Sequence, residues 1–300
     1  MQRKVFIHTN ERQWLGALVS AYSLVRNSSH SDAFEVEILH VRDAPFLADH
    51  EGQTFLRGGK PRVWRMSDLQ SFTPLRFLPP ERMGHSGRAV VIDPDVFAVG
   101  DIYELLSLDM GDAAVMGRQR SDKPEKAWQV ATSVMLLDCS RLGHWQPEKE
   151  FAQLFAFERD YKDWIALGHE PPENVGILDP VWNDFDRLTP ETRLLHNTKR
   201  RTQPWKTGLP VDYTPAEKLG RIPGLRQLDA LRARIFGPYG LLGRYERHPD
   251  PRQEAFFFGL LRECLERGVI DEAIVRDEMA QDHVRHDALE LASRAAPLVA

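Results

Sequence analysis

Two aspartates with one proline between them, Asp93 and Asp95, follow a run of four apolar residues at 89–92. If this run is a buried strand, it carries both carboxylates to the carboxyl end of a sheet, where open α/β sheets bind their ligands. Residues i and i+2 of a strand share a face, so the two carboxylates can converge on one ion. Carboxylate oxygens suit Mg²⁺ or Mn²⁺, and an ion with few protein ligands keeps positions open for the oxygens of a diphosphate. The competing interpretation is an acidic turn followed by a helix that Asp101 caps.

A second pair with the same spacing, Asp184 and Asp186, shows that the spacing alone does not identify a metal site. His196 follows two apolar residues and precedes a polar, basic run, where an imidazole could complete a site of two carboxylates. A lone histidine is more often structural. The cations that follow it are Lys199, Arg200, Arg201 and Lys206. This run is either a solvated loop or a source of positive charge for a leaving diphosphate.

The elements that would position these residues alternate in the first third of the chain. Short apolar runs at 4–8, 34–41 and 88–93 are typical of buried strands, and apolar residues at helical spacing within 15–25 predict a helix. Strand, helix and strand in this order predict a parallel β-α-β unit. The sequence therefore favours an α/β fold with an open sheet that binds nucleotides.

Later in the chain the pattern changes from strands to helices. Strand-like runs lie at 112–117 and 132–138, and residues 148–167 predict a helix. We find no repeat of fixed period. We therefore expect an α/β domain at 1–210 and a C-terminal helical region at 211–300, packed on the same core.

Two helix starts carry the pattern of a capping box, in which two side chains close the first turn. Asn10 with Gln13 would begin the first helix, and Asp250 with Gln253 would begin a late one. A proline directly after Asp250 and a glycine near the far end strengthen the prediction of the late helix.

The composition excludes several classes of protein. The 300 residues are 42% hydrophobic, enough for a sizeable core, and the formal charge of -5 disfavours binding to nucleic acid or anionic lipid. No run is long and apolar enough for a signal-peptide core or a transmembrane segment. With two cysteines, Cys139 and Cys264, we expect a reduced, cytoplasmic protein.

Four segments are informative together, because their order along the chain follows a known pattern. They are RAVVIDPDVFAVGDIYELL (88–106), TSVMLLDCSRLGHW (132–145), LDPVWNDF (178–185) and LLHNTKRRTQPWKTG (194–208). The ordered set resembles glycosyltransferase family 8, the group that contains glycogenin and bacterial lipopolysaccharide galactosyltransferases, over roughly residues 4 to 210. The resemblance implies a GT-A fold: an open, mixed, mostly parallel sheet flanked by helices. It also implies a nucleotide-sugar donor, Mn²⁺ or Mg²⁺ held by Asp93, Asp95 and His196, and retention of the anomeric configuration.

The same resemblance implies which residues contact the donor. His8, Thr9 and Asn10, at the end of the first strand, lie where the family grips the nucleoside. Arg76 would reach the sugar or phosphate, although a buried ion pair is the competing interpretation. Pro94 would stiffen the turn between the two aspartates.

Three positions depart from the family pattern. Ala131 stands where an asparagine commonly faces the donor sugar, so that Thr132 or Ser133 would supply a hydroxyl instead. Trp164 replaces a glutamine after Asp163, which is our candidate for stabilising the developing oxocarbenium ion or orienting the acceptor; an ordinary surface acid is the alternative. Gln203 replaces the lysine of the family's "KPW" segment. The cation for the diphosphate must then come from Lys206, Arg200 or Arg201.

The sequence thus predicts a glycosyltransferase that uses a nucleoside-diphosphate sugar, with UDP as the expected nucleotide. The acceptor would be a carbohydrate, a lipid-linked sugar or a small molecule, near the segment FGPYGLLGRYER at 236–247. Two alternatives stay open. One is nucleotidyl transfer or sugar-nucleotide hydrolysis with the same metal, and the other is a catalytically degenerate member that only binds nucleotide.

Overall fold

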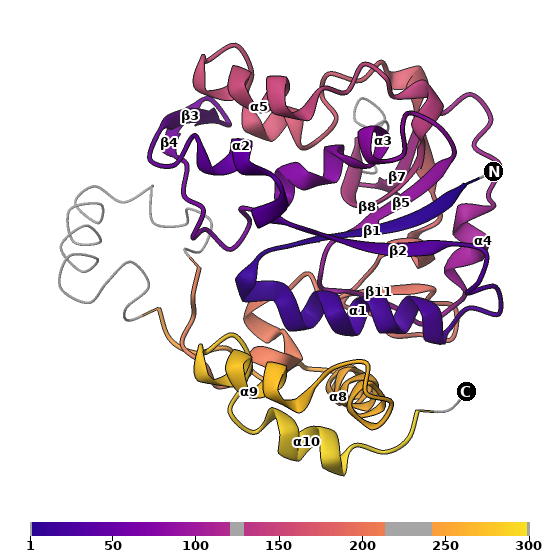
Figure 1. Ribbon diagram of the computed structural model, residues 1–300, viewed down its shortest axis with the longest axis vertical. Helices are drawn as coiled ribbons and strands as arrows, with labels where there is room; N and C mark the ends of the chain where they lie inside the picture. Colours follow the sequence, from indigo (N-terminus) through magenta and orange to yellow (C-terminus); the bar gives the residue numbers. More distant parts are fainter. Residues whose placement is uncertain (1, 121–128, 214–241, 299–300) are drawn as a thin grey trace.

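The computed structural model describes residues 2–120, 129–213 and 242–298, and its centre is a six-stranded sheet in the order β2-β1-β5-β8-β7-β9 (Figure 1). The strands are β1 (Arg3–Thr9), β2 (Glu35–His40), β5 (Arg88–Ile92), β7 (Val115–Gln119), β8 (Val130–Asp138) and β9 (Val175–Leu178). β1 pairs in parallel with β2 and β5, and β7 with β9, whereas β8 runs antiparallel to both its neighbours. The open, mixed and mostly parallel sheet that the sequence predicts is confirmed.

Strand β5 lies in the interior of this sheet and leads to the Asp-Pro-Asp turn. Its residues 89–92 are fully buried, and they alternate between the two faces. Ala89 and Val91 belong to the apolar cluster on one face, and Val90 and Ile92 to the cluster on the other. An unbroken apolar run is what a strand covered on both faces requires.

Helices cover both faces of the sheet (Figure 1). They are α1 (Trp14–Arg26), α2 (Pro45–Ala48), α3 (Pro79–Arg82), α4 (Ile102–Leu106), α5 (Pro147–Phe155), α6 (Tyr161–Trp164), α8 (Pro251–Glu266), α9 (Glu272–Ala280) and α10 (Ala288–Arg294). α1 and α4 lie on one face, and α5 and α6 on the other. α8, α9 and α10 pack against the outer side of α1, in an apolar cluster that includes Phe97 and Trp205.

Two small sheets complete the fold. β3 (Thr54–Arg57) and β4 (Lys60–Val63) form a hairpin. β6 (Val96–Ala98), β11 (Leu194–His196) and β10 (Asp184–Phe185) form a three-stranded sheet directly after the Asp-Pro-Asp turn. α1 approaches that turn closely, because a Cβ atom on Gly16 would lie 2.8 Å from the carbonyl oxygen of Pro94. A glycine at position 16 is therefore needed for this packing.

Three local predictions are wrong, each because a tertiary or backbone effect prevailed. The helix expected over 148–167 is divided into α5 and α6, since Phe157 adopts a left-handed φ of 60° and Asp160 caps a new helix. The side chain of Asn10 caps no helix and bonds instead to Leu69 O and Ser71 Oγ. Gln253 forms no capping box, because its amide reaches Asp186 and Asn197.

Other local predictions are confirmed. Asp101 accepts a bond from the backbone N–H of Tyr103 at the start of α4. Asp250 does the same with the N–H of Arg252 at the start of α8, and Pro251 is the first residue of that helix.

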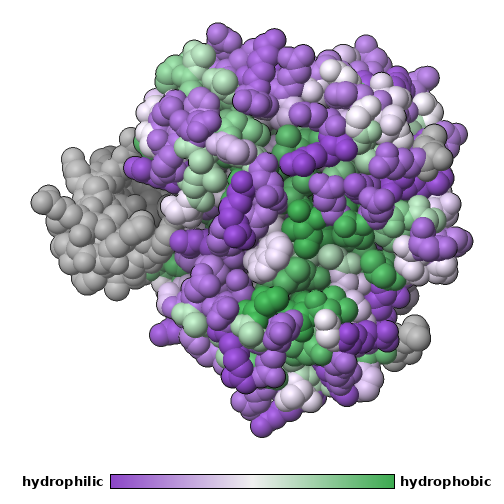
Figure 2. All heavy atoms as spheres, viewed as in Figure 1, coloured by the Kyte–Doolittle hydropathy of each residue, from purple (hydrophilic) through white to green (hydrophobic). Residues whose placement is uncertain are grey.

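The face of the molecule that is turned toward the viewer in Figure 1 is largely polar. Figure 2 shows apolar residues gathered mainly over β2 and α1, with polar residues over most of the rest of this face. Within the described ranges, no helix has the length and apolar character needed to cross a membrane.

Candidate metal and nucleotide site

Asp93, Asp95 and His196 meet at the carboxyl end of β5. One ligand atom from each lies within 4.8 Å of the others, and among the described residues this is the one such group of metal-ligating side chains. The turn that carries the aspartates is closed by a bond from Val96 N to Asp93 O. His196 arrives because β11 pairs antiparallel with β6, with His196 opposite Val96. The predicted trio is therefore brought together by strand register.

The imidazole of His196 is held in one orientation. Asn183 donates from Nδ2 to Ser133 Oγ at 3.0 Å, so its Oδ1 faces the ring and accepts a bond from His196 Nδ1 at 2.8 Å. Nε2 then points toward Asp95, with 3.3 Å to its Oδ1. Burial opposes the charged imidazole, but the carboxylates of Asp95 and Asp93 outweigh it and raise the pKa of His196. Fixing a ligand histidine through its other nitrogen is a common feature of metal sites.

Asp93 is held in its ionised form by two buried neighbours. Its Oδ1 lies 2.9 Å from Arg76 Nη2 and 2.8 Å from His8 Nε2. Burial alone would raise the pKa of Asp93, but the Arg76 guanidinium and the bond from His8 lower it to about 2. Burial lowers the pKa of His8, which fits a neutral ring that donates from Nε2. Because both bonds go to Oδ1, Oδ2 is the oxygen left for another ligand.

Arg76 forms the buried ion pair that the sequence left as an alternative. The residue is 6% exposed, and its second terminal nitrogen, Nη1, donates to Thr132 Oγ1. Thr132 in turn donates to the carbonyl of Ile165 at 2.7 Å. Arg76 and Thr132 thus support Asp93 from behind.

A cleft of about 190 Å³ opens on the trio. It is lined by Gln13, Leu69, Gln70, Phe72, Asp93, Pro94, Asp95, His196, Thr198, Arg200 and Gln203. Gln203, which is 1% exposed, donates from Nε2 to Asp95 Oδ2 at 2.9 Å. The remaining oxygen of Asp95 faces His196, so the amide fixes the carboxylate without cancelling its charge.

The residues at the end of β1 lie behind the cleft and shape it. His8, Thr9 and Asn10 are all buried. Asn10 holds the segment 68–71, which supplies Leu69 and Gln70 to the cleft wall, and its own Oδ1 is buried without a partner. The sequence did not predict the wall residues, since they follow no strand and carry no ionisable group.

The three candidate cations have different surroundings. Lys206 is fully buried, and its Nζ lies 2.8 Å from Asp212 Oδ2. Arg201 pairs with Glu246 at 2.8 Å. Arg200 lines the cleft, with its guanidinium 5.5 Å from the ring centre of Tyr213. The structure thus places Arg200 in the same cleft as the trio, whereas Lys206 does not line that cleft.

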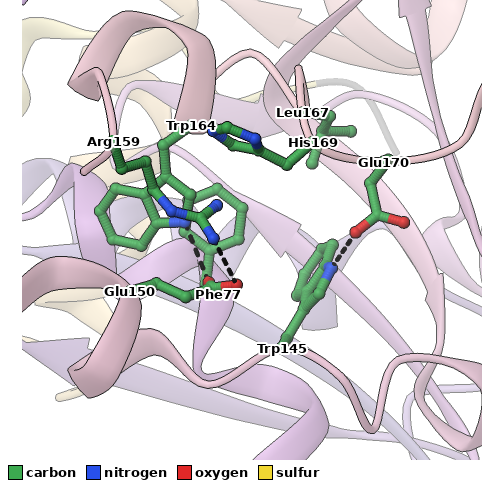
Figure 3. A pocket seen from close by; sticks show the side chains of 8 residues that line it. All are labelled: Phe77, Trp145, Glu150, Arg159, Trp164, Leu167, His169 and Glu170. Carbon is green, nitrogen blue, oxygen red and sulfur yellow. Dashed lines mark hydrogen bonds and ion pairs between the residues drawn. The ribbon is translucent and has the colours of Figure 1, made fainter. Parts of the chain in front are cut away.

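Asp163 and Trp164 also lie apart from the trio. Asp163 is exposed on α6 and does not line the cleft. Trp164 is 3% exposed, stacks on Phe77 and donates to Glu150 (Figure 3). The small cavity beside it, about 20 Å³, has room for about one water molecule. Trp164 therefore belongs to the apolar layer between α5 and the sheet.

A comparison with known proteins found no matching family model and no matching curated protein. Similar solved structures include the glycosyltransferase GlyE of Streptococcus pneumoniae, with 15% identity, a TM-score of 0.48, and coverage of 68% of this chain and 56% of GlyE. Mouse xyloside xylosyltransferase 1 matches with 15% identity and a TM-score of 0.44, over 66% of this chain and 98% of its own. The galactosyltransferase LgtC in complex with donor and acceptor sugar analogs matches with 14% identity and a TM-score of 0.47, over 78% and 96%. This chain spans little more than half of GlyE.

Proposed function

We propose that this protein is a metal-dependent glycosyltransferase that uses a nucleoside-diphosphate sugar, with UDP as the nucleotide, and retains the anomeric configuration. The observation that carries the proposal is the convergence of Asp93, Asp95 and His196 on one point at the edge of the cleft. Two carboxylates and an imidazole are suitable ligands for Mn²⁺ or Mg²⁺.

The residues present fit such an ion. Within the described part of the chain, no hydrogen bond reaches Asp93 Oδ2, while Oδ1 is fixed by Arg76 and His8. His196 presents Nε2 because Asn183 occupies Nδ1. Bound there, Mn²⁺ or Mg²⁺ would act as a Lewis acid toward the departing diphosphate.

The surrounding residues have separate tasks in this proposal. Arg200 places a positive charge at the cleft wall, where it would stabilise the charge that builds on the diphosphate as the sugar leaves. Thr198 and Gln13 offer polar groups to the same cleft. Leu69 and Phe72 provide an apolar wall for a nucleoside.

A second candidate function follows from the position of Asp163. Apart from Asp93 and Asp95, the described residues that line the cleft include no carboxylate. No third carboxylate therefore lines the cleft to stabilise an oxocarbenium ion, which favours a protein that binds nucleotide without transferring sugar.

Part of the segment proposed for the acceptor, residues 236–241, lies outside the described residues. The carboxylate role of Asp163 stays a prediction.

Binding and turnover distinguish these functions. We expect isothermal titration calorimetry to show UDP binding that requires Mn²⁺, and Asp95→Asn to abolish it. Asp112→Asn, a change at an exposed aspartate before β7, serves as the matched control and should bind like the wild type. Unchanged Mn²⁺-dependent binding in Asp95→Asn contradicts the proposed metal site.

A screen of nucleotide sugars then identifies the reaction. Slow Mn²⁺-dependent release of UDP from one donor, faster with an acceptor, is the result expected of a transferase. Release of pyrophosphate indicates nucleotidyl transfer, and release that no acceptor accelerates indicates hydrolysis. Tight UDP binding with no turnover of any donor supports the binding protein.

A further inference from the structure

The second Asp-x-Asp pair, Asp184 and Asp186, lies beside His196 but outside the cleft. Asp184 is 4% exposed, and its Oδ2 accepts a bond from Thr192 Oγ1 at 2.8 Å. Asp186 has a left-handed φ of 53°, a conformation that aspartate adopts more readily than most residues. Neither residue lines the cleft. The function proposed above leaves this pair without a role.

Four polar groups of Asp186 bond to segments that build the site. Its backbone N–H donates to the carbonyl of His196 at 2.9 Å, and its own carbonyl accepts from Gln253 Nε2 at 2.9 Å. Its carboxylate accepts from the backbone N–H of Lys199 at 3.1 Å through Oδ1, and from Thr198 Oγ1 through Oδ2. Three of the four bonds therefore go to residues 196–199.

These bonds fix the segment that we call the His196 loop, residues 196–200. The loop leaves the short strand β11 and supplies His196, Thr198 and Arg200 to the cleft. Asn197 attaches the same loop to two further places: its N–H donates to the carbonyl of Asp95 at 3.0 Å, and its Nδ2 donates to Gln253 Oε1 at 2.6 Å. The loop is thus clamped between the metal turn, Asp186 and the first turn of α8.

We propose that Asp186 is a positioning residue for the metal site: it sets the place of His196 and Thr198 without touching the ion or the substrate. The inference rests on the proposed metal site. Its physical basis is that Thr198 and Lys199 lie beyond the end of β11, where strand pairing does not reach, and the Asp186 carboxylate accepts a bond from each of them. Removing a residue that orients a metal ligand typically weakens metal binding about tenfold to a hundredfold.

Substitutions at 186 and 184 form a matched set. Asp186→Ala removes both side-chain acceptors. Asp186→Asn keeps one acceptor and the tolerance of a left-handed φ, so it should rescue most of the function. Asp184→Asn alters the other acid of the pair, whose bond goes to Thr192 and not to the His196 loop. It is the control for a general loss of stability.

The first measurement is the Mn²⁺ affinity of each protein, from the electron paramagnetic resonance signal of free Mn²⁺, well below each unfolding temperature. We expect Asp186→Ala to bind about tenfold to a hundredfold more weakly than the wild type, Asp186→Asn to lose less than Asp186→Ala, and Asp184→Asn to bind normally. Normal affinity in Asp186→Ala, or an equal loss in Asp184→Asn, overturns the inference.

The second measurement does not need the metal. Hydrogen exchange followed by mass spectrometry should show faster exchange of the peptide that contains the His196 loop in metal-free Asp186→Ala, and no change in Asp184→Asn. Unchanged exchange in Asp186→Ala overturns the inference even if affinity falls. If the wild type binds no Mn²⁺ while the exchange difference is present, the proposed function fails and the bracing of the loop by Asp186 stands.

Discussion

Removing one partner of the ion pair between Arg76 and Asp93 should be among the most destabilising single substitutions in this protein, because it leaves the other charge unpaired. Asp93 lines the cleft and Arg76 lies buried behind it, with Asp93 Oδ1 2.9 Å from Arg76 Nη2. The pKa of Asp93, about 2 against an ordinary value of 3.8, corresponds to about 2 kcal/mol in favour of the ionised carboxylate in the folded state. The Asp93 carboxylate therefore depends on the charge of Arg76 to stay ionised in this buried position.

The substitution Arg76→Met removes the charge and keeps most of the apolar stem. It leaves the Asp93 carboxylate with His8 alone and deprives Thr132 Oγ1 of its donor. Breaking a buried ion pair in this way costs about 3–5 kcal/mol. For a chain of this length 1 kcal/mol shifts Tm by about 2 °C, so we expect Tm to fall by about 6–10 °C.

A double-mutant cycle tests the cause of that loss by thermal unfolding without added metal. Asp93→Asn makes the partner neutral, so the double variant should lose less stability than the sum of the two single changes, by about 1–3 kcal/mol. Arg141→Met, at an exposed arginine, controls for the loss of a charge and should leave Tm within about 1 °C. Additive effects within about 0.5 kcal/mol would show that Arg76 acts through packing and not through Asp93.

Two further predictions concern the α1–α8 contact and the cleft. The bond from Arg26 lowers the pKa of Glu263 from its ordinary 4.5, so the stability that this pair gives is present above about pH 4.5 and is lost as the pH falls through the lowered value. Glu263→Gln should therefore have a lower Tm than the wild type at pH 7, a difference that shrinks below pH 4.5; a constant difference across that range refutes the assignment. Arg200→Gln should weaken Mn²⁺-dependent UDP binding about tenfold or more in calorimetry, because it removes a charge-assisted bond to the diphosphate. Arg201→Gln, whose partner is Glu246, should bind nearly normally, and equal losses in both would contradict the role given to Arg200.

Local sequence was sufficient where the deciding forces are local. The apolar run at 89–92 was sufficient to predict the buried strand β5, and the end of that strand places Asp93 and Asp95 at the sheet edge. Asp101 and Asp250 cap helices because the amides they bond lie two residues away. Asp101 Oδ1 also accepts a bond from Ser28 Oγ, a contact that adds to the cap without displacing it.

Sequence reasoning failed where a long side chain had a distant partner. Gln253 has the spacing of a capping box, yet its amide bonds across to Asp186 and Asn197, residues more than fifty positions earlier. For the same reason the sequence left the choice among Lys206, Arg200 and Arg201 open. Lys206 is adjacent to Trp205, which packs into the core against Phe257, and this carries the lysine inward to Asp212. The local sequence around Lys206 and Arg200 does not show that the first is buried and the second lines the cleft.

Neutral amides orient two of the three residues of the trio, whereas Asp93 is held by Arg76 and His8. Asn183 fixes the ring of His196, and Gln203 fixes the carboxylate of Asp95. Gln253 and Asn197 join the His196 loop to α8. A lysine at position 203 would pair with Asp95 and cancel part of the negative charge that a divalent ion needs, whereas glutamine leaves that charge intact. Under the proposed function, Arg200 would then supply the positive charge for a diphosphate, and Gln253 of α8 holds the His196 loop of the candidate metal site through Asn197 and Asp186.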